Sequence, residues 1–295
     1  MLFTNFIIFD LEFNSTKLEN SDKSLNEIIE IGAVKLNESL QEIDSFSSFI
    51  KPVISKKLNH YVKNLTHISE AELQKADMFS NVIKDFVSWC NANEETVFMT
   101  WSDTDLHVLM ENYNIILKND KIDFIEYYAD LQKYIQKFIT TENNNQISLK
   151  SAAEHYNIKT DDFALHRAQD DSRICAELFA KTYDKNVFKS CLRNLKDVDF
   201  FKRLLFKPYI ISNLKSEGID KNTLFFDCPI CQQNIKFSGK YNPRIKAFSN
   251  VIKCGNCKKK IAVTFKFKKT FDGINIIKRA KEFIKINKKD KTTVQ

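Results

Sequence analysis

The sequence predicts an α/β domain followed by a smaller domain that carries a cysteine cluster. Over the first 183 residues, apolar and β-branched runs typical of strands alternate with segments of helical periodicity. The charge then changes sign: residues 1–180 hold 17 Lys and Arg against 29 Asp and Glu, whereas residues 181–295 hold 28 against 9. Two C-x-x-C pairs lie in this basic part. The basic part is therefore a candidate binder of a polyanion.

The first domain is predicted to contain strands that form one sheet and helices that cover it. The first three strands follow one another closely and predict an antiparallel meander. Ser148 can cap the helix that follows it, and Asp103 is assigned as the cap of the helix that begins near it. The predicted strands are residues 2–13, 27–36, 43–50 and 96–101, and the predicted helices are residues 69–91, 103–113, 127–138, 149–156 and 170–183.

The remaining chain divides by composition into three further parts. Residues 184–224 are basic and amphipathic and predict a linker of short helices between the domain at 1–183 and the next one. Residues 225–268 alternate like strands between the cysteine pairs. Residues 269–295 predict a basic helix, at 273–287, and a disordered tail.

The composition also bears on where the chain works. No run approaches the roughly 18 apolar residues that span a membrane. The N-terminal segment lacks the positive start of a signal peptide, and seven cysteines that include two C-x-x-C pairs suit metal binding in a reducing compartment. We therefore expect a cytoplasmic protein without a membrane partner.

Two acids lie in the first strand, where apolar residues surround them. Asp10 and Glu12 are two residues apart, so their side chains project from the same face of the strand. Paired carboxylates are costly in apolar surroundings unless a cation neutralises them, and carboxylate oxygens suit Mg²⁺ or Mn²⁺. An edge strand with a wet face is the alternative, so this pair alone is weak support for a metal site.

Two later segments supply further candidates. Asp105 lies where a strand ends and a helix begins, a common place for ligand-binding groups, and capping by Asp103 leaves it without a structural role. His166 precedes Asp171 by five residues at the start of a helix. An imidazole with a pKa of about 6.5 suits removal of a proton from water. The other four histidines are interpreted as structural.

Together these segments resemble the DEDD exonuclease superfamily, in its histidine-containing DEDDh branch. The D-x-E motif is matched by Asp10-Leu11-Glu12, the second motif by Asp105, and the H-x-x-x-x-D motif by His166 and Asp171. The match is colinear over about residues 4–183, and Trp101 beside the second motif favours the RNA-processing relatives of histone-mRNA and small-RNA exonucleases. His67 departs from the pattern, because the family usually has glycine there.

The resemblance implies a ribonuclease-H-like fold, a mixed five-stranded sheet flanked by helices. It implies a 3′→5′ exonuclease that releases nucleoside monophosphates from RNA or single-stranded nucleic acid with a free 3′ end. Two Mg²⁺ or Mn²⁺ ions about 4 Å apart would clamp the phosphate. Asp10 would bridge both ions, Glu12 and Asp171 would hold the ion on the nucleophile side, Asp105 would support the second, and His166 would be the general base. The implied substrate contacts are Leu11, Phe13, Leu65, Thr66 and Trp101.

Two other functions remain open at this point. One is a DNA proofreading or repair 3′→5′ exonuclease, which would be indifferent to the 2′-hydroxyl. The other is a non-catalytic adaptor that binds nucleic acid through its cysteine domain. The intact set of acids and histidine favours an enzyme.

The cysteine pairs Cys228–Cys231 and Cys254–Cys257 lie 22 residues apart and resemble a zinc ribbon. Four thiolates favour one structural Zn²⁺, whereas disulfides or redox chemistry fit this context poorly. Basic and aromatic residues are interleaved here, and we favour nucleic-acid binding over the alternative, in which the aromatics form the core and the lysines are solvated. The aromatics are Phe237, Tyr241, Phe248, Phe265 and Phe267.

Overall fold

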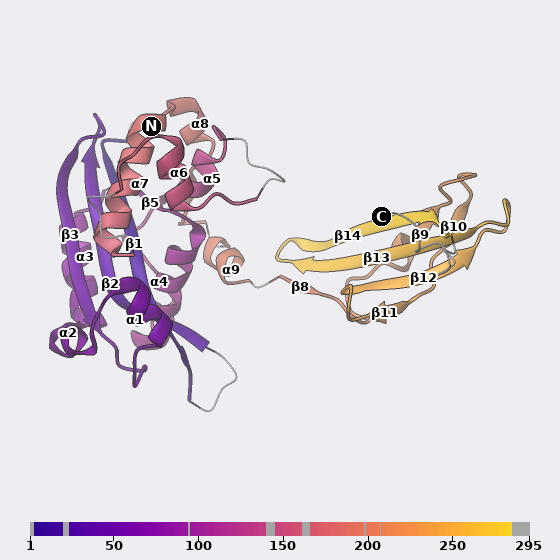
Figure 1. Cartoon of the computed structure of the whole chain (residues 1–295), viewed down its shortest axis with the longest axis horizontal. Coiled ribbons are helices and arrows are strands. Elements are labelled where there is room, and N and C mark those ends of the chain that lie inside the picture. The colour runs from indigo at the N-terminus through magenta and orange to yellow at the C-terminus, as the bar shows by residue number, and fades with distance from the viewer. Residues whose placement is uncertain are drawn as a thin grey trace, which may run out of the picture. The chain divides into compact units, whose positions relative to one another are not determined.

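The computed structural model describes residues 3–19, 24–93, 95–139, 145–160, 166–197, 199–206 and 208–284. The chain forms two compact units, residues 1–204 and 205–295 (Figure 1). The tail predicted at 288–295 lies outside the described residues. Within the described ranges, the helices are all too short or too polar to cross a membrane.

A mixed sheet organises the first unit. Its central strand β1 pairs antiparallel with β2 and parallel with β5, and β2 pairs antiparallel with β3. The predicted meander and mixed α/β sheet are therefore confirmed, with a two-residue strand added at each edge. In sheet order the strands are β4 (Asp77–Met78), β3 (Glu42–Lys51), β2 (Ser24–Asn37), β1 (Asn5–Lys17), β5 (Thr96–Thr100), β6 (Tyr127–Asp130) and β7 (Arg193–Asn194).

The helices differ from the prediction at two places. The helix predicted at 69–91 is divided, because Ala76 is extended and the next two residues pair with β3. The helix predicted at 127–138 begins as β6, because residues 127–130 complete the sheet beside β5. The helices are α1 (His60–Thr66), α2 (Glu70–Lys75), α3 (Phe79–Cys90), α4 (Asp103–Ile116), α5 (Leu131–Ile135), α6 (Leu149–His155), α7 (Ala168–Thr182), α8 (Lys185–Lys189) and α9 (Phe200–Leu205).

Strand β1 contributes to two hydrophobic cores, one on each face of the sheet. Ile7 and Phe9 pack with α3 and α4 on one face. Phe6 and Ile8 pack with α5, α6, α7 and α8 on the other. Side chains alternate along a strand, so Asp10 continues the face that α7 covers. The same alternation that builds the two cores thus directs the acids toward α7.

The second unit contains a five-stranded antiparallel sheet and a separate two-stranded one. The helix predicted at 273–287 is wrong for its described part: Gly273–Glu282 forms a strand that pairs along β13, and Ile274 and Ile276 pack against the core. The strands are β8 (Tyr209–Ile210), β9 (Phe225–Asp227), β10 (Asn234–Lys236), β11 (Lys240–Asn242), β12 (Ala247–Lys253), β13 (Lys260–Thr270) and β14 (Gly273–Glu282), with a 3₁₀ helix η2 at Lys221–Thr223.

The predicted linker at 184–224 is shared between the two units. Phe188 and Leu195 are buried in the first unit, and β7 extends its sheet. Beyond the boundary at 204, β8 pairs with β13 and so belongs to the second unit. Apolar side chains within this basic stretch therefore pack into the cores of both units, which the charge pattern alone does not predict.

Aromatic side chains fill the core of the second unit. Phe237 stacks on Phe265 with ring centroids 4.3 Å apart, and Phe267 packs beside Phe248. All four rings are buried, and Tyr241 is half-buried against them. The four phenylalanines therefore form the core of the second unit, as the alternative to nucleic-acid binding expected, because they cover one face of the sheet.

Candidate active site and cysteine cluster

Three carboxylates converge where β1 meets α7. Asp10, Glu12 and Asp171 each offer an oxygen within 4.8 Å of the others. Asp171 is 8% exposed, and the two acids of β1 are half-buried. Oxygen donors at this spacing suit a hard divalent cation such as Mg²⁺ or Mn²⁺. The arrangement can neutralise a cation and present it to an anionic substrate.

Asp105 reaches the same place from the first turn of α4. The parallel pairing of β1 with β5 runs only as far as Ile8, where β5 is about to turn into α4. The backbone of Leu11, beyond that pairing, lies close enough to lower the pKa of Asp105. Asp105 is 7% exposed and lies close enough to raise the pKa of Asp10 by charge repulsion.

Burial raises the pKa of every acid in this group, and repulsion from neighbouring acids adds to the effect. Burial raises the pKa of Asp10 well above its usual value, and Asp105, Glu12 and Asp171 add to the effect. Burial and the neighbouring Asp171 raise the pKa of Glu12 to about 9. Burial raises the pKa of Asp105 to about 7 and that of Asp171 to about 6. Near neutral pH the metal-free group therefore keeps protons that a bound cation would displace.

Glu30 is a further buried acid beside this group, and sequence reasoning missed it. It lies opposite Glu12 in the β1–β2 register and is 1% exposed. Arg167 neutralises it: Nε lies 3.2 Å from both carboxylate oxygens and Nη2 lies 2.9 Å from Oε1. An acid inside the apolar strand at 27–36 was the available signal.

Gly32 allows α7 to approach the sheet closely enough to bring Asp171 to β1. It lies opposite Asp10 in the register, and a Cβ there would be only 2.1 Å from the backbone nitrogen of Gln169. The Ser172 hydroxyl donates to the Gly32 carbonyl at 3.1 Å and fastens the contact. Without a side chain at this position, backbone packs directly on backbone.

His166 precedes α7 and is tied to the acid group through its backbone. Its N–H donates to Asp171 Oδ2 at 3.2 Å, and its φ of 66° turns the chain sharply at this point. The imidazole is exposed. Desolvation lowers the pKa of His166 below its usual value, which favours the neutral imidazole that a general base requires.

The residue that caps the N-terminus of α4 is not Asp103, as predicted, but the preceding residue. Ser102 is the N-cap of α4 and accepts a hydrogen bond from the Thr104 N–H. Asp103 instead pairs with Lys133 at 2.6 Å and with Arg193 at 3.1 Å. Burial alone would raise the pKa of Asp103, but hydrogen bonds from these two cations lower it. Asp103 is thus committed to a structural ion pair with β7 and α5.

The predicted substrate contacts lie on three elements. Leu11 is buried with α4, and Phe13 is partly buried beside it. Trp101 packs against the opposite core. In α1, Leu65 is half-buried, and the buried Thr66 hydroxyl donates to the Val62 carbonyl. Contact of these five residues with substrate stays a prediction.

The unusual His67 ends α1 in a left-handed conformation. Its φ of 57° and ψ of 14° lie in the region that glycine adopts without strain. Asn14, which is buried on β1, holds the chain before α1 in place: it donates to the Lys57 carbonyl and accepts from the Asn59 N–H. The helix therefore keeps its place beside the acid-bearing part of β1 although histidine replaces the usual glycine.

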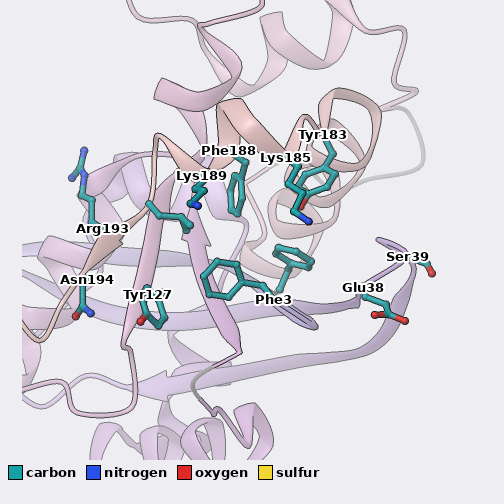
Figure 2. A pocket seen from close by; sticks show the side chains of 12 residues that line it. Phe3, Glu38, Ser39, Tyr127, Tyr183, Lys185, Phe188, Lys189, Arg193 and Asn194 are labelled. Atoms are coloured by element: carbon teal, nitrogen blue, oxygen red, sulfur yellow. The ribbon is translucent and has the colours of Figure 1, made fainter. Parts of the chain in front are cut away.

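One cavity in the first unit lies away from the acids. Figure 2 shows this pocket of about 580 Å³, with Phe3, Tyr127 and Phe188 among its walls and Lys185 and Lys189 beside them. Phe3 precedes β1 and Tyr127 begins β6, whereas Asp10 lies further along β1. The lining of this pocket contains none of the four acids Asp10, Glu12, Asp105 and Asp171.

The four cysteines form one cluster in the second unit. The Sγ atoms of Cys228 and Cys257 lie 3.7 Å apart, and those of Cys231 and Cys254 lie 3.5 Å apart. Tetrahedral zinc–sulfur bonds of about 2.3 Å place sulfurs roughly 3.8 Å apart. The thiols are free, and the donor set fits a thiophilic ion such as Zn²⁺.

The two cysteine turns have the same backbone geometry. In one turn Gln232 N donates to the Cys228 carbonyl, and in the other Lys258 N donates to the Cys254 carbonyl. Both donors are left-handed, with φ of 60° and 62°. Two matching turns that present thiols toward one point support a single shared metal ion.

Comparison with known proteins identifies the first unit. Residues 7–179 match the RNase_T family, described as exonuclease. The chain is 28% identical over 189 residues to the PolC-type DNA polymerase III of Caldanaerobacter subterraneus, which covers 61% of this chain and 12% of the polymerase. It is 33% identical over 86 residues to 3′-5′ exoribonuclease 1 of Rattus norvegicus, which covers 28% of this chain and 25% of that protein.

Solved structures share the fold. The nuclease domain of 3′hExo, a DEDDh family member bound to rAMP, has a TM-score of 0.53 and 22% identity, covering 65% of this chain and 96% of that chain. A 3′-exonuclease that recognises the 3′ end of the histone mRNA stem-loop has a TM-score of 0.55 and 20% identity, covering 66% and 86%. The α/β fold predicted from the resemblance is thereby confirmed.

Proposed function

Because the chain belongs to the RNase_T exonuclease family, we propose that it is a metal-dependent 3′→5′ exonuclease that releases nucleoside monophosphates. One observation carries the proposal: Asp10, Glu12 and Asp171 converge within 4.8 Å where α7 meets β1. The chain spans only 12% and 25% of the lengths of the polymerase and exoribonuclease that it matches, so the activity of the whole protein is inferred from this site.

The carboxylates fit two Mg²⁺ or Mn²⁺ ions, which when bound would activate water and stabilise the leaving 3′-oxygen. Asp10 would bridge the two ions, because it lies among the other acids. Glu12 and Asp171 would hold the ion on the nucleophile side, and Asp105 would support the second. All four donors are hard oxygen ligands with raised pKa values, which favours replacement of their protons by cations.

His166 would accept the proton from the attacking water. Its lowered pKa keeps the imidazole neutral near pH 7, and its exposure leaves the ring free to reach a substrate. The hydrogen bond from its backbone to Asp171 fixes the start of the side chain beside a metal ligand.

We favour RNA or single-stranded nucleic acid with a free 3′ end as substrate. Similarity to 3′-5′ exoribonuclease 1 supports RNA. The match to PolC, which covers more of this chain, supports DNA proofreading or repair as the second candidate. The substrates differ in the 2′-hydroxyl, so matched RNA and DNA oligonucleotides separate the two functions.

Hydrolysis of 5′-labelled oligonucleotides tests the proposed activity. With Mg²⁺ or Mn²⁺, we expect stepwise shortening from the 3′ end of RNA or single-stranded DNA, and less on a blunt duplex. Asp10→Ala and His166→Ala should each lower the rate at least 100-fold. His155→Ala, at an exposed histidine at the end of α6, is the control and should keep full activity. Full activity of the Asp10 variant, or in excess EDTA, would refute the assignment.

We infer further that the cysteine cluster holds one structural Zn²⁺ in a zinc ribbon. Thiolates on two matching turns support this ion over a hard cation. One zinc per chain is expected by elemental analysis, and Cys228→Ser with Cys254→Ser should abolish it. Cys90→Ser, at a thiol in the first unit, is the control and should retain it.

The second unit would tether the substrate. Its 21 Lys and Arg against 6 Asp and Glu in residues 205–295 suit a polyanion, whereas the first unit is acidic. A chain ending at residue 204 should bind an oligonucleotide more weakly and with a shallower salt dependence. Unchanged affinity and slope would refute the tethering role.

A further inference from the structure

The outer face of the sheet β11–β14 is not used by the core of the second unit. Along β13, Ile261, Val263, Phe265 and Phe267 all point into the core. The alternate positions of β13 therefore face the other way, and register pairs them with alternate positions of β12 and β14. Figure 1 shows these strands side by side. We call this surface the outer sheet face.

All the charged residues on the outer sheet face are cationic. The outward positions of the four strands include no Asp or Glu. Within the described part of the chain, none of these cations has a carboxylate at ion-pair distance, whereas Lys259, at the end of the sheet, pairs with Glu282 at 3.1 Å. The cations are Lys240, Lys253, Lys260, Lys266, Lys268, Arg279 and Lys281.

A shallow groove of about 320 Å³ runs across the middle of this face. Ala247, which is 2% exposed, lies in it, and the exposed Ile245 and Ile277 line it. Lys266 and Arg279 line the same groove from neighbouring strands. The groove therefore combines an aliphatic surface with two cations in its lining.

Seven like charges on one small sheet repel one another, and a polyanion would relieve that repulsion. Residues 285–295 carry four lysines against one aspartate, so this remaining segment of the chain has the wrong sign to neutralise the face. The complementary ligand is one with negative charges in series and apolar groups between them.

We propose that the outer sheet face binds the sugar–phosphate backbone of single-stranded nucleic acid. Lys266 and Arg279 would contact successive phosphates, and Ile277 would lie against sugars or unpaired bases in the groove. Because the phenylalanines are in the core, the binding rests on charge and aliphatic contact rather than on aromatic stacking, and it should be nearly independent of sequence and strongly dependent on salt. The proposal deepens the tethering role stated above by assigning it to one surface.

The test measures binding of a fluorescein-labelled 20-nucleotide single strand, as RNA and as DNA, to the full chain. Every protein carries Asp10→Ala so that the probe is not consumed. Lys266→Glu, Arg279→Glu and Lys281→Glu together should weaken binding at least tenfold at low salt. They should also reduce the slope of log affinity against log salt by about 2, since each lost phosphate contact on a single strand contributes roughly 0.7.

The control carries two charge reversals of the same kind away from the outer sheet face, so its effects are compared with those of the triple variant per substitution. Lys215→Glu and Lys236→Glu are exposed, and Lys236 belongs to the separate β9–β10 sheet, so this variant should nearly retain the affinity and slope. Zinc content should equal that of the parent in both variants, which shows that the second unit is folded. The proposal would be overturned if the triple variant kept the affinity and salt slope of the control. It would also be overturned if the triple variant bound the oligonucleotide normally and lost only its binding to phosphatidylserine vesicles.

Binding is measured apart from hydrolysis, so the two proposals fail separately. In the background with intact Asp10, the triple variant should cleave a dinucleotide, whose single phosphodiester is the bond to be cleaved, at the parental rate. If no substrate is cleaved but the binding difference persists, the exonuclease proposal fails and the surface assignment stands.

Discussion

At the scale of single residues, the acid group depends on how each charge is compensated. Among the described residues, Asp10, Glu12, Asp105 and Asp171 form no ion pair, whereas Glu30 and Asp103 are paired with arginine or lysine. Uncompensated acids with raised pKa values are candidates for metal binding. The neutralised acids hold the surrounding elements in place.

Removal of the Arg167 charge should show that the ion pair with Glu30 stabilises the fold. Arg167→Met leaves the buried Glu30 without its cationic partner, and we expect a loss of about 2 kcal/mol in the free energy of unfolding, discounted because Arg167 is about one-third exposed. Arg173→Met is the control, since its ion-pair distances are 3.5 and 3.7 Å, and should cost less than about 0.5 kcal/mol. Urea unfolding of both variants measures the difference; equal losses would contradict it.

At the scale of elements, α7 is the part that completes the site. Its hydrophobic residues pack on the face of β1 that carries Asp10, and its first turn supplies Asp171. The absence of a side chain at Gly32 sets how closely the helix approaches the sheet. Stability and activity are therefore coupled at this contact.

Gly32→Ala should displace α7 and damage both properties. The added Cβ meets backbone rather than a flexible side chain, so we expect a loss of about 2 to 3 kcal/mol in stability and at least a tenfold loss of exonuclease rate in the molecules that stay folded. Gly255→Ala, where the nearest atom is 4.0 Å away, is the control and should be neutral in both assays. Thermal unfolding and single-turnover hydrolysis check the two effects, and a variant with parental activity would show that α7 tolerates the shift.

At the scale of the whole molecule, the two units carry opposite charge and different metal donors. The first unit presents oxygen donors in an acidic body, and the second presents sulfur donors in a basic one. Metal binding at the first site should neutralise the repulsion that an anionic substrate would meet there. The stability of the first unit should therefore depend on both pH and divalent cations.

The direction in which stability changes with pH follows from the raised pKa values of the acids. A carboxyl group whose folded-state pKa exceeds its unfolded value contributes stability below the unfolded value, near pH 4, and loses it as pH rises through the folded value. Those folded values are about 6 for Asp171, about 7 for Asp105 and about 9 for Glu12. Without divalent metal, the melting temperature of the first unit should fall between pH 5 and pH 9.

Mg²⁺ should oppose that fall, so its stabilising effect should be larger at pH 8.5 than at pH 5.5. Asp105→Asn with Glu12→Gln should flatten the metal-free pH dependence, and Asp123→Asn, at an acid outside the group, should leave it unchanged. Differential scanning fluorimetry over this pH range provides the measurement. A metal-free melting temperature that rises toward pH 9 would contradict the proposed burial of the acid group.

Local spacing determined much of what the sequence predicted. The meander and the shared face of Asp10 and Glu12 follow from a two-residue period, and the two cysteine turns follow from C-x-x-C spacing. The strands β6 and β14 were predicted as helices, because a short segment reveals neither the sheet edge that it will pair with nor the core that it will cover.

By itself, the sequence determined the order of the acids along the chain, the kinds of metal-binding side chain and the opposite charges of the two parts. Each of these depends only on residue identity and local spacing. Only the tertiary structure decided that Gly32 admits α7, that Arg167 neutralises Glu30, and that the phenylalanines of the second unit face inward while its cations share the outer sheet face. These outcomes depend on contacts between segments far apart in the chain, and only close packing brings such segments together.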